Sequence, residues 1–398
     1  MATAILDVDL QEPPQQMTGL DRYQRALVLV RWRGRPVGQV ALPVIEGTIG
    51  GARLREALMN AAEVVVRERW LYEYLGWEEV RQQTHSVTPT ATVAVCTRDR
   101  TEDLRRCLDA LMRMPDDGQQ EFIVVDNSPS TDATRLLVRA YDRVHYVRED
   151  RRGLNAARNR ALREARHEVV AFIDDDAVPD PAWLRALLLN FDDPLVLCVT
   201  GLTMTLELET EAQEWSERYS PFGRGFQRRV FESGQINPLA VGRVGAGVNM
   251  ALRRSAVEQV GFFDEALDAG TPARSGGDNE MFTRILLAGY RIVYEPAALN
   301  WHRHRRTWEE LRAAIYGYGV GVYAAWTRSP LVEGELSVLK VAFNWLRHDQ
   351  LPALVRSLLH RPGSTPLDLL WAELRGCAAG PWAYYSYRKR LRDGGGQA

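Results

Sequence analysis

The feature that most constrains the fold is an unbroken apolar run at residues 169–173, which ends in three consecutive aspartates, Asp174, Asp175 and Asp176. Apolar residues in a row, without alternation, are typical of a strand that is buried on both faces of a sheet. Ligands of open α/β sheets bind beyond the carboxyl ends of the strands, and the aspartates lie at such an end. The run therefore predicts a helix-covered sheet with a candidate site at one edge.

Further apolar runs alternate with helical segments, which is the pattern of strands joined by crossover helices. Strands are expected at 92–96, 122–125, 144–147, 248–252 and 292–294, and helices at 154–166 and 280–287. A capping box, Thr307 with Glu310, predicts the start of another helix. The expected fold class is α/β, with a parallel-type sheet and crossover helices over residues 90–326.

A smaller part is expected on each side of this region. Residues 1–85 predict an α+β module of unknown role, with strands at 26–30 and 37–42 and a helix at 52–75 whose buried face carries Leu54, Leu58, Ala61 and Val65. The polar stretch at 82–92 is expected to be a linker. Residues 327–398 predict helices at 338–346 and 351–359 and a disordered glycine-rich tail.

Composition excludes several classes of function. The 50 basic and 52 acidic side chains give a net charge of -2, which supplies no global attraction for nucleic acid. The only lysines, Lys340 and Lys389, do not follow a glycine, so a phosphate-binding Gly-Lys-Ser/Thr loop is excluded. The four cysteines show no zinc-binding spacing. An acidic N-terminus and the lack of a long apolar run predict a cytoplasmic protein.

The three aspartates predict metal or phosphate chemistry. Adjacent carboxylates repel one another unless a cation or hydrogen-bond donors compensate. Hard oxygen ligands on so short a span suit Mg²⁺ or Mn²⁺ bound together with substrate phosphates. The alternative is a helix cap, but Asp180 and Pro181 are expected to begin the next helix themselves.

Asp126 ends the preceding strand in the same manner. It can form a local Asx-turn, or its carboxylate can accept a hydrogen bond from a nucleotide base. The end of another strand brings Thr97 and Asp99 to the same edge. These side chains together favour a shared nucleotide pocket.

Arg158 lies on an otherwise apolar helical stripe. Because an unpaired buried guanidinium is costly, it requires an anionic partner. An internal aspartate and a bound nucleotide both satisfy that requirement. Asn155, one turn earlier, can share the contact.

Two later segments carry further candidates. Asp278 precedes an apolar helix, so it is either the N-cap of that helix or a group facing a cleft, and Glu280 follows in the first turn. His302 lies in an extended segment with His304, among Arg303, Arg305 and Arg306. These histidines can be ordinary surface groups, whereas the arginines suit a diphosphate.

Taken in order, these segments resemble family 2 glycosyltransferases. The resemblance implies the GT-A fold, a nucleotide-binding mixed sheet with flanking helices. The resemblance covers residues 92–326 and rests on segments 93–101, 123–128, 153–161, 172–176 and 277–280. It implies that the nucleotide pocket is formed by Thr97, Asp99, Asp126, Asn155, Arg158, Asp174 and Asp175. It further implies that Asp174 and Asp176 form the D-x-D element, that His302 is a late metal or diphosphate ligand, and that Asp278 is the catalytic base.

The resemblance implies transfer of one sugar from a UDP- or dTDP-sugar to an acceptor hydroxyl, with inversion and with help from Mg²⁺ or Mn²⁺. The sequence departs from the family's usual motifs in two places. Gly277 stands where the family often has Glu, so Glu280 is an alternative base, and the Gln-x-x-Arg-Trp element of processive synthases is missing after Asp278. The second departure favours single-sugar transfer over polymerisation.

The partners implied are a nucleoside-diphosphate sugar and a sugar or lipid-linked acceptor, with no nucleic acid. The C-terminal helices suit peripheral contact with the inner face of a membrane or an oligomer interface.

Two other functions stay open. One is a non-catalytic sugar-nucleotide-binding or scaffold protein, and the other is an NAD-dependent oxidoreductase using the turn at Gly245 and Gly247.

Overall fold

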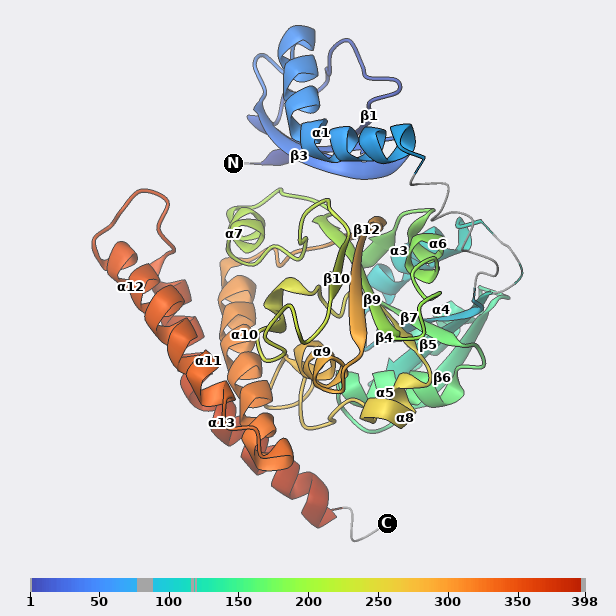
Figure 1. Ribbon diagram of the computed structural model, residues 1–398, viewed down its shortest axis with the longest axis vertical. Helices are drawn as coiled ribbons and strands as arrows, with labels where there is room; N and C mark the ends of the chain where they lie inside the picture. Colours follow the sequence, from blue (N-terminus) through green and yellow to red (C-terminus); the bar gives the residue numbers. More distant parts are fainter. Residues whose placement is uncertain (1, 77–88, 116–117, 119, 395–398) are drawn as a thin grey trace.

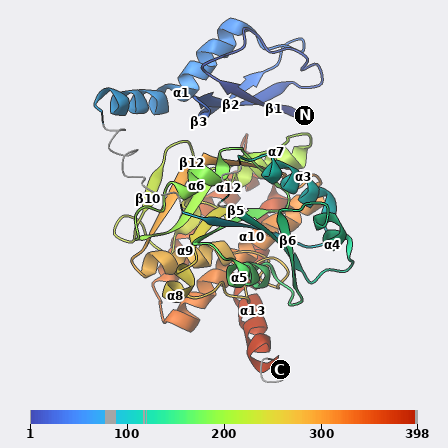
Figure 2. The same ribbon diagram turned by 90° about the vertical axis from the view of Figure 1, so that its right-hand side faces the viewer.

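The computed structural model describes residues 2–76, 89–115, 118 and 120–394. A domain boundary at residue 85, most of the expected linker at 82–92 and most of the glycine-rich tail therefore lie outside the described residues. Figures 1 and 2 show a large central part, a small N-terminal sheet on one side of it, and long C-terminal helices along another side.

The central sheet has strand order β10-β12-β9-β11-β7-β4-β5-β6, with β8 paired to β12. One half is parallel and consists of β4 (Ala91–Thr97), β5 (Gln120–Asn127), β6 (Val144–Glu149) and β7 (Val169–Asp174). The other half is mixed and consists of β8 (Ala177–Pro179), β9 (Val196–Thr205), β10 (Arg229–Phe231), β11 (Asn249–Arg253) and β12 (Arg291–His302). β11 is antiparallel to both of its neighbours, β7 and β9. The expected mixed α/β class is thus confirmed.

Helices bury both faces of this sheet. One hydrophobic cluster contains Val93 and Val95 of β4 with α3 (Thr101–Met112) and α6 (Trp183–Leu188). The opposite cluster contains Ala94 with α5 (Leu154–Glu164) and α9 (Gly277–Leu287). Alternate residues of one strand therefore enter different cores, as the pleat requires. The remaining helices of this part are α4 (Ala133–Val138), α7 (Glu211–Tyr219), α8 (Ala256–Val260) and the 3₁₀ turn Val241–Arg243.

Strand β12 is much longer than the expected 292–294. It passes Pro296 through an irregularity in its pairing with β9, between Glu295 and Leu299, and ends at His302. Because proline lacks an N–H, it is tolerated where the ladder is interrupted. This irregularity carries the strand onward, so that its last residue reaches β8, directly after the three aspartates.

The N-terminal sheet contains β1 (Thr3–Asp9), β2 (Arg25–Trp32) and β3 (Arg35–Pro43), covered by α1 (Gly51–Tyr74). The hairpin between β2 and β3 turns at Arg33 and Gly34, both with positive φ, as a type I′ turn requires. The pattern did not predict β1, and the buried face of α1 carries Ala62 in place of Ala61. The sheet contacts the central part through Arg31, whose Nη2 lies 2.7 Å from Asp180 Oδ2.

The C-terminal region is helical, as expected. Helix α10 (Trp308–Arg328) opens with the predicted capping box and packs along α13 (Leu367–Gly394). Between them, α11 (Val338–Trp345) and α12 (Leu351–Leu358) join through a π-helical turn, Leu346–Gln350, and a second π turn, Ser329–Glu333, follows α10. The boundary expected at residue 326 falls inside α10. Among the described residues, no helix is both long and apolar enough to cross a membrane.

Candidate active site at the carboxyl edge of the sheet

Asp174, Asp176 and His302 come together at the edge where β7 ends. One potential ligand atom from each of the three lies within 4.8 Å of the others. His302 reaches the aspartates because β12 pairs with β8, and its Nε2 lies 3.0 Å from Asp176 Oδ1. The sequence placed the acids and the imidazole 126 residues apart, so the sheet pairing creates this cluster. We call Asp174, Asp175, Asp176 and His302 the aspartate cluster.

Charge within the aspartate cluster is unevenly compensated. Burial and the neighbouring Asp176 carboxylate raise the pKa of Asp175 to about 7, although Thr97 Oγ1 donates to it at 2.6 Å. Burial also raises the pKa of Asp174. His302, Arg100 and Arg305 together overcome burial and hold the pKa of Asp176 well below its usual range. Arg100, which the sequence did not single out, contacts both Asp175 and Asp176 at 3.1 Å.

The residues of this cluster fit a divalent cation. Two carboxylates and an imidazole are ligands that suit Mn²⁺, and carboxylates suit Mg²⁺. His302 Nδ1 is buried and has no hydrogen-bond partner among the described residues, while Nε2 on the other side of the ring faces Asp176 Oδ1. A cation at this position would also offset the repulsion that raises the pKa of Asp175.

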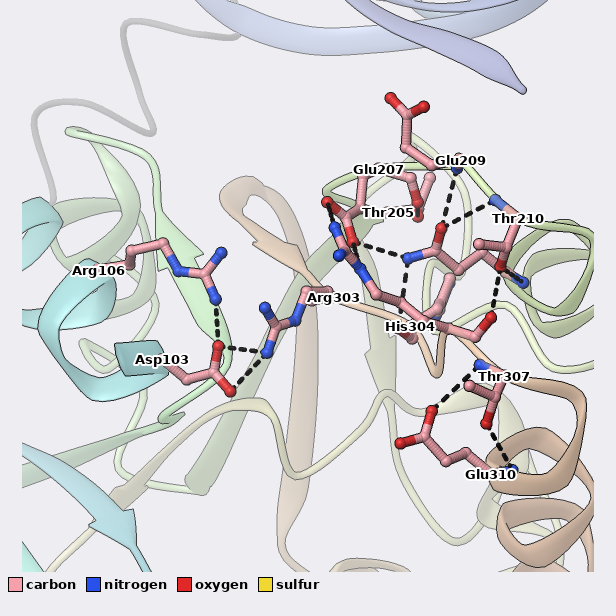
Figure 3. Close-up of polar contacts among 12 residues, drawn as sticks. Asp103, Arg106, Thr205, Glu207, Glu209, Thr210, Arg303, His304, Thr307 and Glu310 are labelled. Atoms are coloured by element: carbon pink, nitrogen blue, oxygen red, sulfur yellow. Dashed lines mark hydrogen bonds and ion pairs between the residues drawn. The ribbon is translucent and has the colours of Figure 1, made fainter. Parts of the chain in front are cut away.

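The segment after β12 is fixed by a network of polar contacts, which Figure 3 shows. Arg303 Nη2 donates to Asp103 of α3 at 2.6 Å, and Arg306 Nε donates to Glu207 at 2.7 Å. The buried His304 ring contacts Glu217 at 2.8 Å. Of the three arginines expected to suit a diphosphate, only Arg305 therefore brings its guanidinium to the aspartate cluster, at 3.7 Å from Asp176 Oδ2.

Asp180 corrects another expectation. It was expected to be the N-cap of a helix that starts at Pro181, but α6 begins at Trp183 and its N-cap is Ala182. Asp180 Oδ1 accepts a hydrogen bond from the Ala182 N–H in the turn before the helix. Its other oxygen binds Arg31, so the N-terminal sheet holds the segment that follows the aspartates.

The strand ends of β4 and β5 bring Asp99 and Asp126 to the same edge. Asp126 is fully buried; its Oδ2 accepts from the Tyr146 hydroxyl at 2.9 Å, and its Oδ1 has no hydrogen-bond partner among the described residues. Burial raises the pKa of this carboxyl group. Asp99, in left-handed backbone conformation, accepts from the Ser130 N–H. An unpaired buried acceptor suits a donor from a ligand.

Arg158 has an internal partner that the sequence left unidentified. Its Nη1 donates to Asp268 Oδ2 at 2.6 Å and to Asn155 Oδ1 at 3.2 Å, and all three side chains are buried. Burial by itself would lower the pKa of Arg158, but the carboxylates of Asp268, Asp174 and Asp278 outweigh burial and raise this pKa. Asp268 lies in an irregular loop, and no sequence motif there predicted a functional residue. Its positive φ, which the structure shows, is the feature that distinguishes it.

Asp278 lies in the first turn of α9 and is not its N-cap, a position that Gly276 occupies. Its Oδ2 accepts from the Gly247 N–H at 2.7 Å, and its Oδ1 accepts from the Asn279 N–H at 2.8 Å. Gly277 has no room for a side chain, since a Cβ there would lie 2.3 Å from Asn155 Nδ2. The glycine departure is thus a packing requirement of this chain, and Asp278 remains half-buried beside Arg158.

Glu280 belongs to a different set of contacts. Its Oε2 accepts from Arg284 at 2.8 Å, and its Oε1 lies 2.9 Å from Arg328 Nη1. Arg328 also binds Asp264 at 2.9 Å. We call Glu280, Arg284, Arg328 and Asp264 the Glu280 cluster. Both carboxylate oxygens of Glu280 are therefore occupied by arginines, and the side chain is buried.

A cavity of about 740 Å³ opens beside the aspartate cluster. Its wall includes four arginines and one acid: Arg100, Arg152, Arg274, Arg305 and Glu310. Arg100 and Arg305 also contact Asp176, which places the cavity next to the candidate metal ligands. Such a concentration of guanidinium groups suits an anionic ligand.

Comparison with known proteins shows which family part of the chain resembles. Residues 92–261 match the model of glycosyl transferase family 2. This range, less than half of the chain, is similar to family 2 glycosyltransferases. The strand-end residues Thr97, Asp126 and Asp174–Asp176 and the helical Arg158 lie inside the matched range, while Asp278 and His302 lie after it.

Three proteins that are similar to this chain differ in their identity and coverage. A pre-mycofactocin glycosyltransferase of Mycobacterium tuberculosis is 30% identical over 230 residues, covering 57% of this chain and 46% of that protein. Glycosyltransferase AglE of Haloferax volcanii is 28% identical over 248 residues, covering 61% and 75%. The chain thus spans about half the length of the first of these relatives. Among solved structures, a Pyrobaculum calidifontis mannosyltransferase in complex with GDP-Man and Mn²⁺ aligns with a TM-score of 0.45 and 18% identity, over 81% of this chain and 83% of that one.

The oxidoreductase alternative loses its structural basis. Gly245 and Gly247 precede strand β11, whereas a dinucleotide-binding turn opens a helix. Gly247 instead lets its N–H approach Asp278, with Arg158 close by: a Cβ at 247 would lie 2.7 Å from Arg158 Nη2.

Proposed function

We propose that the protein is a glycosyltransferase that moves one sugar from a nucleoside-diphosphate sugar, a UDP- or dTDP-sugar, to an acceptor hydroxyl. The observation that carries the proposal is the aspartate cluster, beside Arg100, Arg305 and the cationic cavity, in a chain that is similar to family 2 glycosyltransferases. Buried carboxylates whose charge is not fully compensated can bind a cation, and the nearby arginines can bind a diphosphate. A metal-bound nucleoside diphosphate supplies both groups.

In this proposal the nucleotide lies along the ends of β4 and β5. Asp126 Oδ1, buried and without a partner, accepts from a base N–H, and Thr97, Asp99, Asn155 and Arg158 shape the same pocket. Asp174 and Asp175 face the ribose and diphosphate. The Arg158 pair with Asp268 makes this arginine a rigid part of the wall, because its guanidinium is held from a second direction.

Departure of the nucleoside diphosphate requires that its developing charge be neutralised. Arg100 and Arg305 already lie at the cluster, and the cavity adds Arg152 and Arg274, which form no ion pair with any described residue. Preorganised positive groups of this kind are a large source of rate enhancement. Asp174, Asp176 and His302 would hold Mg²⁺ or Mn²⁺, which when bound supplies further charge neutralisation to the diphosphate.

Asp278 is the proposed general base. One of its oxygens accepts from the Gly247 N–H and the other from its own helix, so the carboxylate is oriented before substrate binds. It would take the proton of the acceptor hydroxyl as that oxygen attacks the anomeric carbon on the face opposite the leaving diphosphate, which gives inversion. Glu280 is the weaker candidate, because two arginines bind its oxygens.

The acceptor is proposed to be a sugar or lipid-linked molecule, with a role in polysaccharide biosynthesis. The proposal divides the chain into a module at 1–85, the transferase domain at 90–326 and a C-terminal helical region that contacts the inner face of a membrane peripherally.

The deciding experiment is a panel of UDP-, dTDP- and GDP-sugars in a thermal-shift assay with and without Mn²⁺, followed by detection of free nucleoside diphosphate. A raised melting temperature that requires both metal and one donor, with slow donor hydrolysis, supports a transferase. Donor binding without any hydrolysis or transfer would favour the non-catalytic alternative. Absence of binding by every donor would contradict the proposal.

A further inference from the structure

An exposed apolar stripe runs along the helical segment 336–359. Before the π turn, Leu336, Leu339 and Phe343 follow one another at helical spacing and are 65%, 63% and 56% exposed. After it, Leu351, Val355 and Leu358 also lie three or four residues apart and are also exposed. The π turn inserts an extra residue between the two sets, which keeps them on one side of a continuous helix. We call these six residues the outer stripe.

The opposite side of the same helix faces the protein. Val341, Asn344, Trp345 and His348 line a cavity of about 650 Å³, whose other walls include Asn279 of α9 and Trp326 of α10. Asn279 directly follows the proposed base. Figure 1 shows α11 and α12 in line on the side of α10 that faces away from the central sheet. One side of the segment therefore packs against the protein, and the other side is apolar and is not covered by any described residue.

Charge indicates what covers the outer stripe. Residues 336–361 contain four cations, Lys340, Arg347, Arg356 and Arg361, and one acid, Asp349, so the formal charge is 4 − 1 = +3 in a chain whose net charge is -2. All four cations are exposed and form no ion pair with a described residue. Exposed leucines flanked by unpaired lysine and arginine are the composition of helices that lie in a membrane interface.

We propose that segment 336–361 docks the protein on an anionic lipid surface, with the outer stripe among the acyl chains and the four cations at the headgroups. Anionic lipids attract such cations, whereas a second copy of the chain would bring like charges together. The inner cavity would then open toward the membrane at the residue that follows the proposed base. The docking deepens the peripheral membrane contact of the proposed function by naming its surface and its lipid. The last consequence rests on the proposed sugar transfer, because it makes the acceptor lipid-borne, whereas lipid binding by the segment does not require that reaction.

The test is co-sedimentation of the full-length protein with vesicles of phosphatidylcholine alone or with 30% phosphatidylglycerol added, a choice of composition on the order of the anionic content of natural membranes. Binding is expected with the anionic vesicles and should weaken as salt is raised. Leu339→Glu should lower the partition coefficient at least about tenfold, since it removes apolar burial and adds a repelled charge. The matched control is Leu136→Glu on α4, a leucine that is 61% exposed elsewhere on the surface and whose replacement should leave binding unchanged.

A charge variant separates the two contributions. Lys340→Glu with Arg347→Glu should abolish the preference for anionic vesicles, whereas Arg53→Glu with Arg55→Glu on α1 should not. Failure of the wild-type protein to bind anionic vesicles at low salt would overturn the proposal. So would a stable dimer, seen by light scattering, that Leu339→Glu dissociates, because a second copy would then cover the stripe. No donor or turnover enters this assay, so its result is independent of whether the protein transfers sugar.

Discussion

The aspartate cluster and the Glu280 cluster are both buried groups of acids that face arginines, yet they differ in how fully the charges are paired. In the Glu280 cluster each carboxylate oxygen of Glu280 meets a guanidinium, and no buried side-chain nitrogen or oxygen of the cluster lacks a hydrogen-bond partner. In the aspartate cluster the pKa of Asp175 is raised to about 7, and His302 Nδ1 has no partner among the described residues. Burial of acids alone therefore does not indicate a site. Incomplete compensation does, because it leaves room for a ligand to contribute.

Asp176→Ala gives the sharpest test of this difference. Sugar transfer should fall by roughly 10⁴-fold, because a lost metal ligand removes several kcal/mol of charge neutralisation at the diphosphate. The melting temperature without metal should also fall, because His302 and Arg100 lose a buried carboxylate partner, although relief of the repulsion on Asp175 offsets part of this loss. Thermal shifts with Mn²⁺ and the nucleoside diphosphate measure the effect. If metal-dependent stabilisation by the diphosphate persists in the variant, Asp176 is not a ligand.

Asp278→Asn should lower transfer by roughly 10²–10⁴-fold, the usual worth of a positioned base. Donor binding should be nearly unchanged, because the amide keeps the shape of the side chain and one acceptor for the Gly247 N–H. Single-turnover kinetics with saturating donor would measure it. Near-native transfer by this variant, together with inactivity of Glu280→Gln, would move the base into the Glu280 cluster.

Glu280→Gln should act on stability and leave catalysis nearly intact. Removing one charge from a buried, fully paired cluster leaves Arg284 undercompensated and should lower the free energy of unfolding by about 3 kcal/mol. Donor affinity should stay within about twofold of wild type, which is within the noise expected for a residue without ligand contact. Urea unfolding combined with donor titration checks both values. An unchanged free energy of unfolding would contradict the statement that the charges of the Glu280 cluster are fully paired.

The smallest effect concerns Asp126 and pH. Burial raises the pKa of this acid above its value in the unfolded chain, so the folded state holds the proton more tightly. Its contribution to stability is present at low pH and is lost as pH rises from the unfolded pKa through the folded one. Asp126→Asn should flatten that decline in the melting temperature, measured without ligand in acidic to neutral buffers. It should also weaken nucleotide binding, whereas a variant that binds normally would exclude a contact with the base.

The parallel half of the sheet could be predicted closely, and the mixed half could not. Strands β4, β5 and β7 contain continuous apolar runs, so local composition determines them, whereas β6 mixes apolar with polar residues. Strand β12 was underestimated because Pro296 argues against a strand, and only the irregular pairing with β9 accommodates it. Strand β1 was missed altogether, because it gains its pairing from β2 and its docking from the central part.

The sequence by itself determined the α/β class, the resemblance to family 2 glycosyltransferases, and the acids at the strand ends, because apolar periodicity and short motifs are local properties. Tertiary structure alone decided which charges meet. It brought His302 to Asp176, gave Arg158 the partner Asp268, engaged Arg303 and Arg306 elsewhere while leaving Arg305 at the cluster, and paired Glu280 with Arg284 and Arg328. Ion pairing depends on distances between segments that lie far apart in the chain, and no spacing along the sequence encodes those distances.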